Sequence, residues 1–188
     1  MKHYTYIGNF NQWIQPEWIN YLINNDGDYL PTRKENGEEF FDNSEPPWKG
    51  VDPYHGLESW DYKVCCISYK KDILPFEPKD MPFEVDYDDW EYTFIKWKPG
   101  MGQPVHQDYN IKDLGDYPGA KSIEIDRYWM PLTDWDNGHV FLIEDEIITN
   151  YKKGDVFKYN DPMAWHTGGN MGHTLRLTCN LTTWKVIY

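Results

Sequence analysis

The length, composition and charge of this chain exclude several classes of protein. Its 188 residues suit one domain with a sizeable core, and 18% of them are aromatic, including ten Trp and fifteen Tyr. A formal net charge of -13 repels phosphate backbones and anionic lipid, so the sequence disfavours nucleic acid as a partner. Mean hydropathy is -0.79, no apolar run approaches the length of a membrane span, and no secretory hydrophobic region follows Met1. We therefore expect a soluble, unexported protein that makes no membrane contact.

The three cysteines predict a reducing compartment. Cys65 and Cys66 are adjacent, a spacing that rarely satisfies disulfide geometry, and the odd total leaves Cys179 over. We expect a cytoplasmic protein whose cysteines are buried strand residues. The alternative is a redox pair at Cys65 and Cys66.

One short helix is expected near the N-terminus. Pro16 and Glu17 open a segment whose apolar residues recur at helical spacing up to Ile23, and the turn sequence Asn-Asp-Gly follows at residues 25–27. Residues 33–56 are polar and contain several proline turns, which predicts a loop.

The rest of the chain is dominated by strand patterns. β-Branched and aromatic residues alternate with polar ones between turn signals that recur every eight to twelve residues, which is typical of a sandwich or jelly roll. The predicted strands are residues 62–69, 91–98, 122–132, 138–144, 146–151, 153–159 and 174–181. We therefore predict a mainly β protein, a cupin-like jelly-roll barrel with a short N-terminal helix.

A possible metal site begins at His106 and Asp108. In an extended segment residues i and i+2 point to the same side, so this imidazole and this carboxylate face one pocket. The third ligand that we propose is His166, because two histidines and one carboxylate with open positions are typical of non-haem Fe(II) oxygenases. Arg176 stands ten residues beyond His166, in a chain that has only three arginines, and Thr178 follows on the same strand face.

The whole pattern, His106-x-Asp108, His166 and Arg176-x-Thr178, resembles the Fe(II)/2-oxoglutarate-dependent dioxygenase family. The resemblance covers residues 91 to 184 and implies a double-stranded β-helix, with His106, Asp108 and His166 as iron ligands. It also implies that Arg176 pairs with the distal carboxylate of 2-oxoglutarate and that Thr178 hydrogen-bonds it. Some phage-encoded members are similar in size to this chain.

The activity that the resemblance implies uses Fe(II), 2-oxoglutarate and O2. Decarboxylation of 2-oxoglutarate to succinate is coupled to hydroxylation of a substrate, here a small molecule or a protein side chain. Two alternatives stay open: a cupin-type metal-binding jelly roll without this chemistry, and a binding module with a vestigial site. Arg127 is the rival for the carboxylate of 2-oxoglutarate, unless it pairs structurally with an acid. His139 is interpreted as non-ligating.

The expected organisation is a single domain over residues 1–188. Residues 1–85 form a helical and looped lead-in with a supporting strand, and residues 86–188 form the jelly-roll core. The loops at 33–56 and 109–119 are the parts free to cover the mouth of the barrel and select a substrate. We predict that they form a lid. The oligomeric state stays open.

Overall fold

Strands account for most of the regular structure. The computed structural model describes residues 2–14, 16–24, 28–30, 64–69, 81, 83–103, 105–108 and 114–188. The helical segments are η1 (Asn11–Trp13), α1 (Pro16–Asn24) and η3 (Leu114–Asp116). The strands are β1 (Tyr4–Asn9), β2 (Asp28–Leu30), β3 (Val64–Tyr69), β4 (Asp89–Trp97), β5 (Met101–Gly102), β6 (Ser122–Pro131), β7 (His139–Ile143), β8 (Glu146–Ile147), β9 (Asp155–Tyr159), β10 (His166–Asn170) and β11 (Arg176–Ile187).

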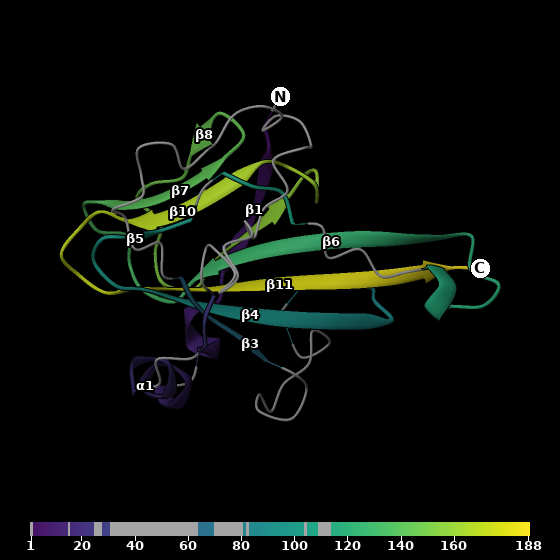
Figure 1. Cartoon of the computed structure of the whole chain (residues 1–188), viewed down its shortest axis with the longest axis horizontal. Helices are drawn as coiled ribbons and strands as arrows, with labels where there is room; N and C mark the ends of the chain where they lie inside the picture. Colours follow the sequence, from purple (N-terminus) through teal and green to yellow (C-terminus); the bar gives the residue numbers. More distant parts are fainter. Residues whose placement is uncertain are drawn as a thin grey trace, which may run out of the picture.

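The strands form two antiparallel sheets that face each other. The larger sheet has seven strands in the order β1-β9-β6-β11-β4-β3-β2, and the smaller has four in the order β5-β10-β7-β8. From β4 onward the chain passes back and forth between the sheets, so that β9 and β11 lie in the larger one and β10 between them lies in the smaller one. Figure 1 shows β7 and β10 above β6, β11 and β4. The predicted cupin-like jelly roll, a double-stranded β-helix, is confirmed.

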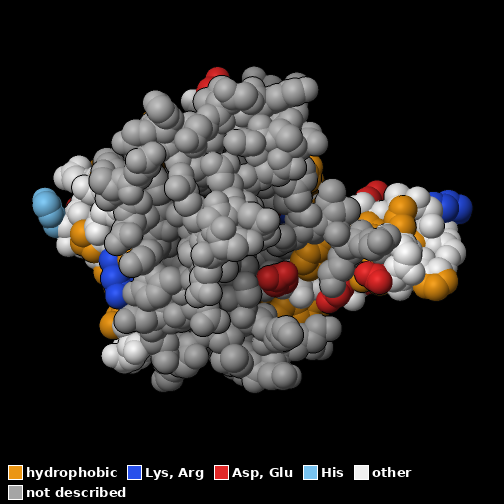
Figure 2. Space-filling view, viewed as in Figure 1, with side chains coloured by type: hydrophobic (Ala, Val, Ile, Leu, Met, Phe, Trp, Pro, Cys, Tyr) orange, Lys and Arg blue, Asp and Glu red, His pale blue; other side chains and the backbone are white. Residues whose placement is uncertain are grey.

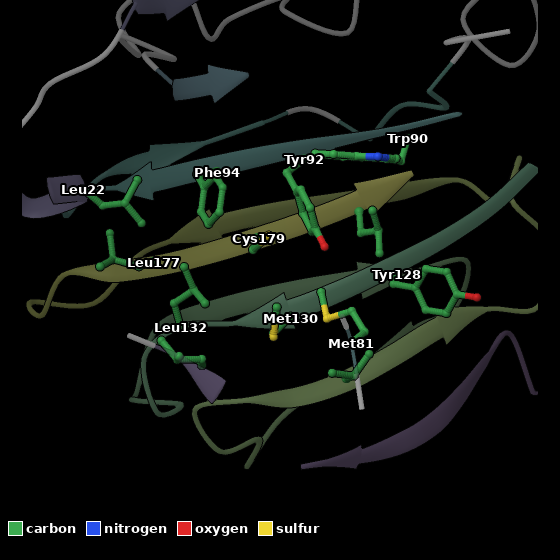
Figure 3. Close-up of a cluster of buried hydrophobic side chains, with 13 residues drawn as sticks. Leu22, Met81, Trp90, Tyr92, Phe94, Tyr128, Met130, Leu132, Leu177 and Cys179 are labelled. Atoms are coloured by element: carbon green, nitrogen blue, oxygen red, sulfur yellow. The ribbon is translucent and has the colours of Figure 1, made fainter. Parts of the chain in front are cut away.

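The two faces of the larger sheet bury different clusters. On β4, Tyr92 and Phe94 point away from the smaller sheet and join a core with Leu22 of α1, drawn in Figure 3. Each buried side chain of this size contributes about 1.5–3 kcal/mol to stability. On the opposite face, Trp129 packs with Phe141 of the smaller sheet, and their rings stack at 4.1 Å with 7° between their planes. This second cluster fills the space between the sheets, where the site lies.

The predicted helix is confirmed as α1, which lies on the outer side of the larger sheet (Figure 1). Leu22 of this helix is 2% exposed, whereas Ile23 is 48% exposed, so one stripe of the helix meets the sheet. Lys96 of β4 donates through Nζ to the carbonyl of Ile23 at 3.0 Å. A cation at the last turn complements the negative end of the helix dipole and fixes α1 on the sheet.

Some strand boundaries differ from those predicted. β8 ends at Ile147 instead of residue 151, because Asn150 adopts a left-handed φ of 58° that turns the chain. β11 runs on to Ile187, because β6 pairs with it as far as Ser122. β1 pairs with β9, so the N-terminal residues complete the same sheet as the predicted core.

The ends of β6 and β11 extend past the smaller sheet and project from the barrel, as Figures 1 and 2 show. Lys121 anchors this projection by donating through Nζ to the terminal carbonyl of Tyr188 at 2.9 Å. Among the described residues, no helix is long and apolar enough to cross a membrane.

Candidate metal centre

His106 and His166 are paired through their backbones. The N–H of each donates to the carbonyl of the other at 2.9 Å, which makes an isolated antiparallel bridge between the chain after β5 and the start of β10. Directly opposed residues of an antiparallel pair place their side chains on the same face. The two rings accordingly lie 4.4 Å apart between centroids, and both residues are buried. A pairing 60 residues apart in sequence thus builds half of the site.

Asp108 completes the group. Its Oδ1 lies 3.4 Å from Nε2 of His106, and its Oδ2 lies 3.5 Å from Nε2 of His166. One ligand atom from each of the three residues lies within 4.8 Å of the others, and no other group of His, Cys, Asp or Glu in the described part of the chain meets this criterion. The structure brings together the three residues that the sequence singled out.

The donor atoms suit a divalent metal. Nδ1 of His166 lies 3.0 Å from the carbonyl oxygen of Ala164, so this carbonyl can hold the proton on Nδ1 when Nε2, which faces Asp108, binds a metal. Burial alone would raise the pKa of the Asp108 carboxyl group. Hydrogen bonds with His106 and His166, and the charges of His166 and Arg127, instead hold that pKa well below its ordinary value. Two imidazoles and an ionised carboxylate can therefore bind a metal on one face.

Arg127 is the charged partner of Asp108. Its Nη1 donates to Oδ2 of Asp108 at 2.6 Å and its Nη2 donates to the backbone carbonyl of Asp108 at 2.7 Å. Arg127 is 4% exposed, and its Nε is buried without a hydrogen-bond partner. Of the two readings that the sequence left open for Arg127, the structure shows the pairing with an acid.

Arg176 lies deep between the sheets. It is 1% exposed, and its guanidinium carbon lies 5.1 Å from the ring centroid of Trp97 and 5.7 Å from that of Trp129. Nε donates to the hydroxyl of Tyr151 at 3.1 Å, and Nη1 makes a long contact of 3.4 Å with the carbonyl of Gly169. Burial lowers the pKa of the guanidinium, and Tyr151 partly opposes this. No Asp or Glu in the described ranges forms an ion pair with Arg176.

A glycine makes room for this arginine. A Cβ atom at Gly168 would lie 2.9 Å from the ring of Trp97 and 3.2 Å from Nη1 of Arg176. Any other residue on β10 at this position would have to displace the ring or the guanidinium. Gly168 is therefore required by the packing of Trp97 and Arg176.

Thr178 lies two residues along β11 from Arg176. It is 1% exposed, and its Oγ1 accepts a hydrogen bond from Nε1 of Trp97 at 3.1 Å. A hydroxyl that accepts one hydrogen bond still has its own proton to donate. The predicted residue thus lies on the same inner face as Arg176.

Tyr159 packs against His166 and lies within electrostatic range of Asp108 and Arg176. Its ring packs edge-on against His166, with centroids 5.4 Å apart and 77° between planes. Burial and the Asp108 carboxylate raise the pKa of Tyr159, and the charges of Arg127 and Arg176 oppose this increase. His166, Tyr159 and Arg176 are all buried in the barrel.

Other predicted features fall outside this group. His139 is buried at the start of β7 and lies apart from His106, Asp108 and His166. Its Nδ1 accepts from the backbone N–H of Asp136 at 3.3 Å, and its Nε2 lies 3.2 Å from Oγ1 of Thr174. The predicted lid loop at 33–56 lies outside the described residues, as do residues 109–113 of the second loop.

Sequence reasoning missed the aromatic lining. Three aromatic side chains contact Arg176 or His166, and the sequence predicted a role in the site for none of them: Trp97, Tyr151 and Tyr159. Trp97 lies in residues 91–98, where apolar and polar residues alternate, so its place in a strand was predicted. Only the register that places Trp97 opposite Arg176 shows which face it shares.

Solved structures of other proteins resemble this chain at low sequence identity. No protein-family model matches the sequence, and no curated protein matches it significantly. The chain is similar to TT1209 from Thermus thermophilus, with 17% identity, 58% of this chain and 89% of that chain covered, and a TM-score of 0.35.

It is also similar to a Cupin 2 conserved barrel domain protein from Salinispora arenicola, with 13% identity, 66% and 78% of the two chains covered, and a TM-score of 0.37. The viral collagen prolyl hydroxylase vCPH from Paramecium Bursaria Chlorella virus-1 has 17% identity, 54% and 63% coverage and a TM-score of 0.39. Likenesses of this size assign the chain to no family.

Proposed function

We propose that this chain is a non-haem Fe(II)/2-oxoglutarate-dependent oxygenase. The observation that carries the proposal is a buried arginine without an acidic partner among the described residues, inside the same barrel as a His-Asp-His group. A metal-binding group alone would serve many kinds of cupin-like protein. Arg176 adds a requirement for an anionic ligand.

The need for an anion follows from the cost of burying a guanidinium. A buried ion is costly unless it is paired and hydrogen-bonded. The rings of Trp97 and Trp129 offset part of this cost, since each cation–π contact contributes about 0.5–2 kcal/mol. Tyr151 and Gly169 accept hydrogen bonds from only two of the five N–H groups of the side chain. A carboxylate would satisfy the remaining donors and the charge together.

In this proposal His106, Asp108 and His166 hold Fe(II), while Arg176 and Thr178 hold the distal carboxylate of 2-oxoglutarate. When bound, iron and 2-oxoglutarate supply the oxidising chemistry with O2, and the chain supplies position and a dry environment. Trp97 and Trp129 exclude water from the guanidinium, which strengthens its attraction for a carboxylate. The hydroxylated substrate is a small molecule or a protein side chain, and the net charge of -13 disfavours nucleic acid.

The proposal is tested by calorimetric titration of 2-oxoglutarate into the protein loaded with Mn(II), which does not support turnover. We expect saturable binding at one site that depends on the metal. Metal binding without 2-oxoglutarate binding would instead indicate a cupin-type metal protein. Failure to bind a metal would indicate a vestigial site.

A further inference from the structure

Asp108 has two carboxylate oxygens, and they have different surroundings. Oδ2 accepts a hydrogen bond from Nη1 of Arg127 at 2.6 Å, whereas Oδ1 lies 3.4 Å from Nε2 of His106 and has no arginine contact. The short N–O distance is that of a charge-assisted hydrogen bond. Before a metal binds, one oxygen is therefore hydrogen-bonded to an arginine, and the other faces His106 without an arginine contact.

Arg127 also holds the backbone that carries this carboxylate. Its Nη2 donates to the carbonyl of Asp108 at 2.7 Å, so one planar fork spans the side chain and the main chain of the same residue. Asp108 lies outside the strands, and no ladder pairing holds it. By contrast, Arg127 extends from β6 in the middle of the larger sheet, where Thr182 of β11 is its direct neighbour. The sheet therefore fixes the carboxylate through this arginine.

We propose that Arg127 is a positioning residue that makes Asp108 a one-oxygen metal ligand. By binding Oδ2 and fixing the orientation of the carboxylate, it opposes chelation of the metal through both oxygens. A six-coordinate metal held by His106, His166 and one oxygen of Asp108 keeps about three positions open. The inference rests on the metal site of the proposed function and is independent of 2-oxoglutarate.

The test uses Mn(II) bound to the full chain and two readouts that do not require activity. The first is the number of metal-bound waters, counted by pulsed electron paramagnetic resonance in oxygen-17-enriched water. The second is the dissociation constant of Mn(II) from calorimetry. Arg127→Met removes both hydrogen bonds, and Arg176→Met is the matched control because it replaces another buried arginine on the same sheet.

We expect about three bound waters in the parent and in Arg176→Met, and one fewer in Arg127→Met because the freed carboxylate chelates. We also expect Arg127→Met to weaken Mn(II) binding by about 10-fold to 100-fold, the scale for losing the group that orients a ligand. An unchanged water count in Arg127→Met would overturn the proposal, whatever the affinity.

Arg127→Lys keeps the test decisive if Arg127→Met does not fold. An ammonium can still donate to Oδ2 but lacks the rigid fork that spans the carboxylate and the backbone carbonyl, so we expect the parent water count with weaker Mn(II) binding. A parent-like dissociation constant in Arg127→Lys would contradict the positioning role. A parent protein that fails to bind Mn(II) would overturn the metal site itself, a result distinct from failure at Arg127.

Discussion

Replacing Arg176 with methionine should have opposite effects on ligand binding and on the stability of the free protein. Methionine fills much of the same space without the charge. A buried guanidinium that lacks an acidic partner among the described residues stabilises the fold little, and burial lowers its pKa because the charged form is disfavoured there. The free energy of unfolding of the ligand-free variant should therefore equal or exceed that of the parent, as when other buried ions are replaced by apolar groups.

The affinity for 2-oxoglutarate should fall instead. Truncating one partner of a desolvated charge pair costs about 2 to 4 kcal/mol, which corresponds to a loss of about 30-fold to about 1000-fold in the dissociation constant. The complete burial of Arg176, at 1% exposed, favours the upper part of this range. The matched ligand is 2-oxopentanoate, which has the same chain length and no distal carboxylate. It should bind parent and variant equally weakly.

Calorimetry on Mn(II)-loaded samples measures the affinity of the parent and of Arg176→Met for 2-oxoglutarate and for 2-oxopentanoate. Urea denaturation of each ligand-free protein measures its free energy of unfolding. A loss of several kcal/mol of stability in Arg176→Met, together with a parent-like preference for 2-oxoglutarate over 2-oxopentanoate, would refute a role for Arg176 in binding the carboxylate. Arg176 would then be a structural residue held by its tryptophan contacts.

Substitutions at the two histidines, at Gly168 and at Asp108 should each change stability in a different way. His106→Ala and His166→Ala should each unfold cooperatively but lose the gain of about 2.7 kcal/mol that a metal at 100 times its dissociation constant gives the parent, measured by thermal denaturation. Gly168→Ala should cost about 1–3 kcal/mol by overpacking, whereas Gly169→Ala, whose nearest atom would be 3.4 Å away, should cost less; equal urea midpoints would contradict this. In metal-free protein, Asp108→Asn should be less stable than the parent near neutral pH. Because the folded pKa of Asp108 is lowered, that difference should shrink as the pH falls below about 4, and a difference independent of pH would oppose it.

The alternation of apolar and polar residues correctly predicted several strands of the core. The 122–132 prediction became β6, because its inward residues meet the barrel and its outward residues meet the α1 side. β10 was not predicted, since its sequence His-Thr-Gly-Gly-Asn has low strand propensity. It is extended because β7 and β5 flank it on both sides, a tertiary effect that a local pattern does not contain.

For the site too, the sequence predicted the features that depend on short spacing and missed those that depend on tertiary contacts. The short spacing of His106 and Asp108 was visible in the sequence, and the offset of Arg176 from His166 was visible as well. The pairing of Arg127 with Asp108 was not visible, because it depends on which oxygen atoms lie beside the guanidinium. Arg127 of β6 donates to Asp108, which lies 19 residues earlier in the chain and outside the strands. No offset along one strand specifies that contact.

The most direct measurement of the proposed activity is an anaerobic titration of the protein with Fe(II) and then with 2-oxoglutarate, followed by visible absorption. A keto acid chelated to Fe(II) gives a weak charge-transfer band, and we expect the band to appear only when protein, Fe(II) and 2-oxoglutarate are all present and to saturate at one equivalent. Arg176→Met should need a far higher concentration of 2-oxoglutarate to reach the same absorbance. Bound Fe(II) without any band at saturating 2-oxoglutarate would contradict the proposed function and leave a metal-binding jelly roll.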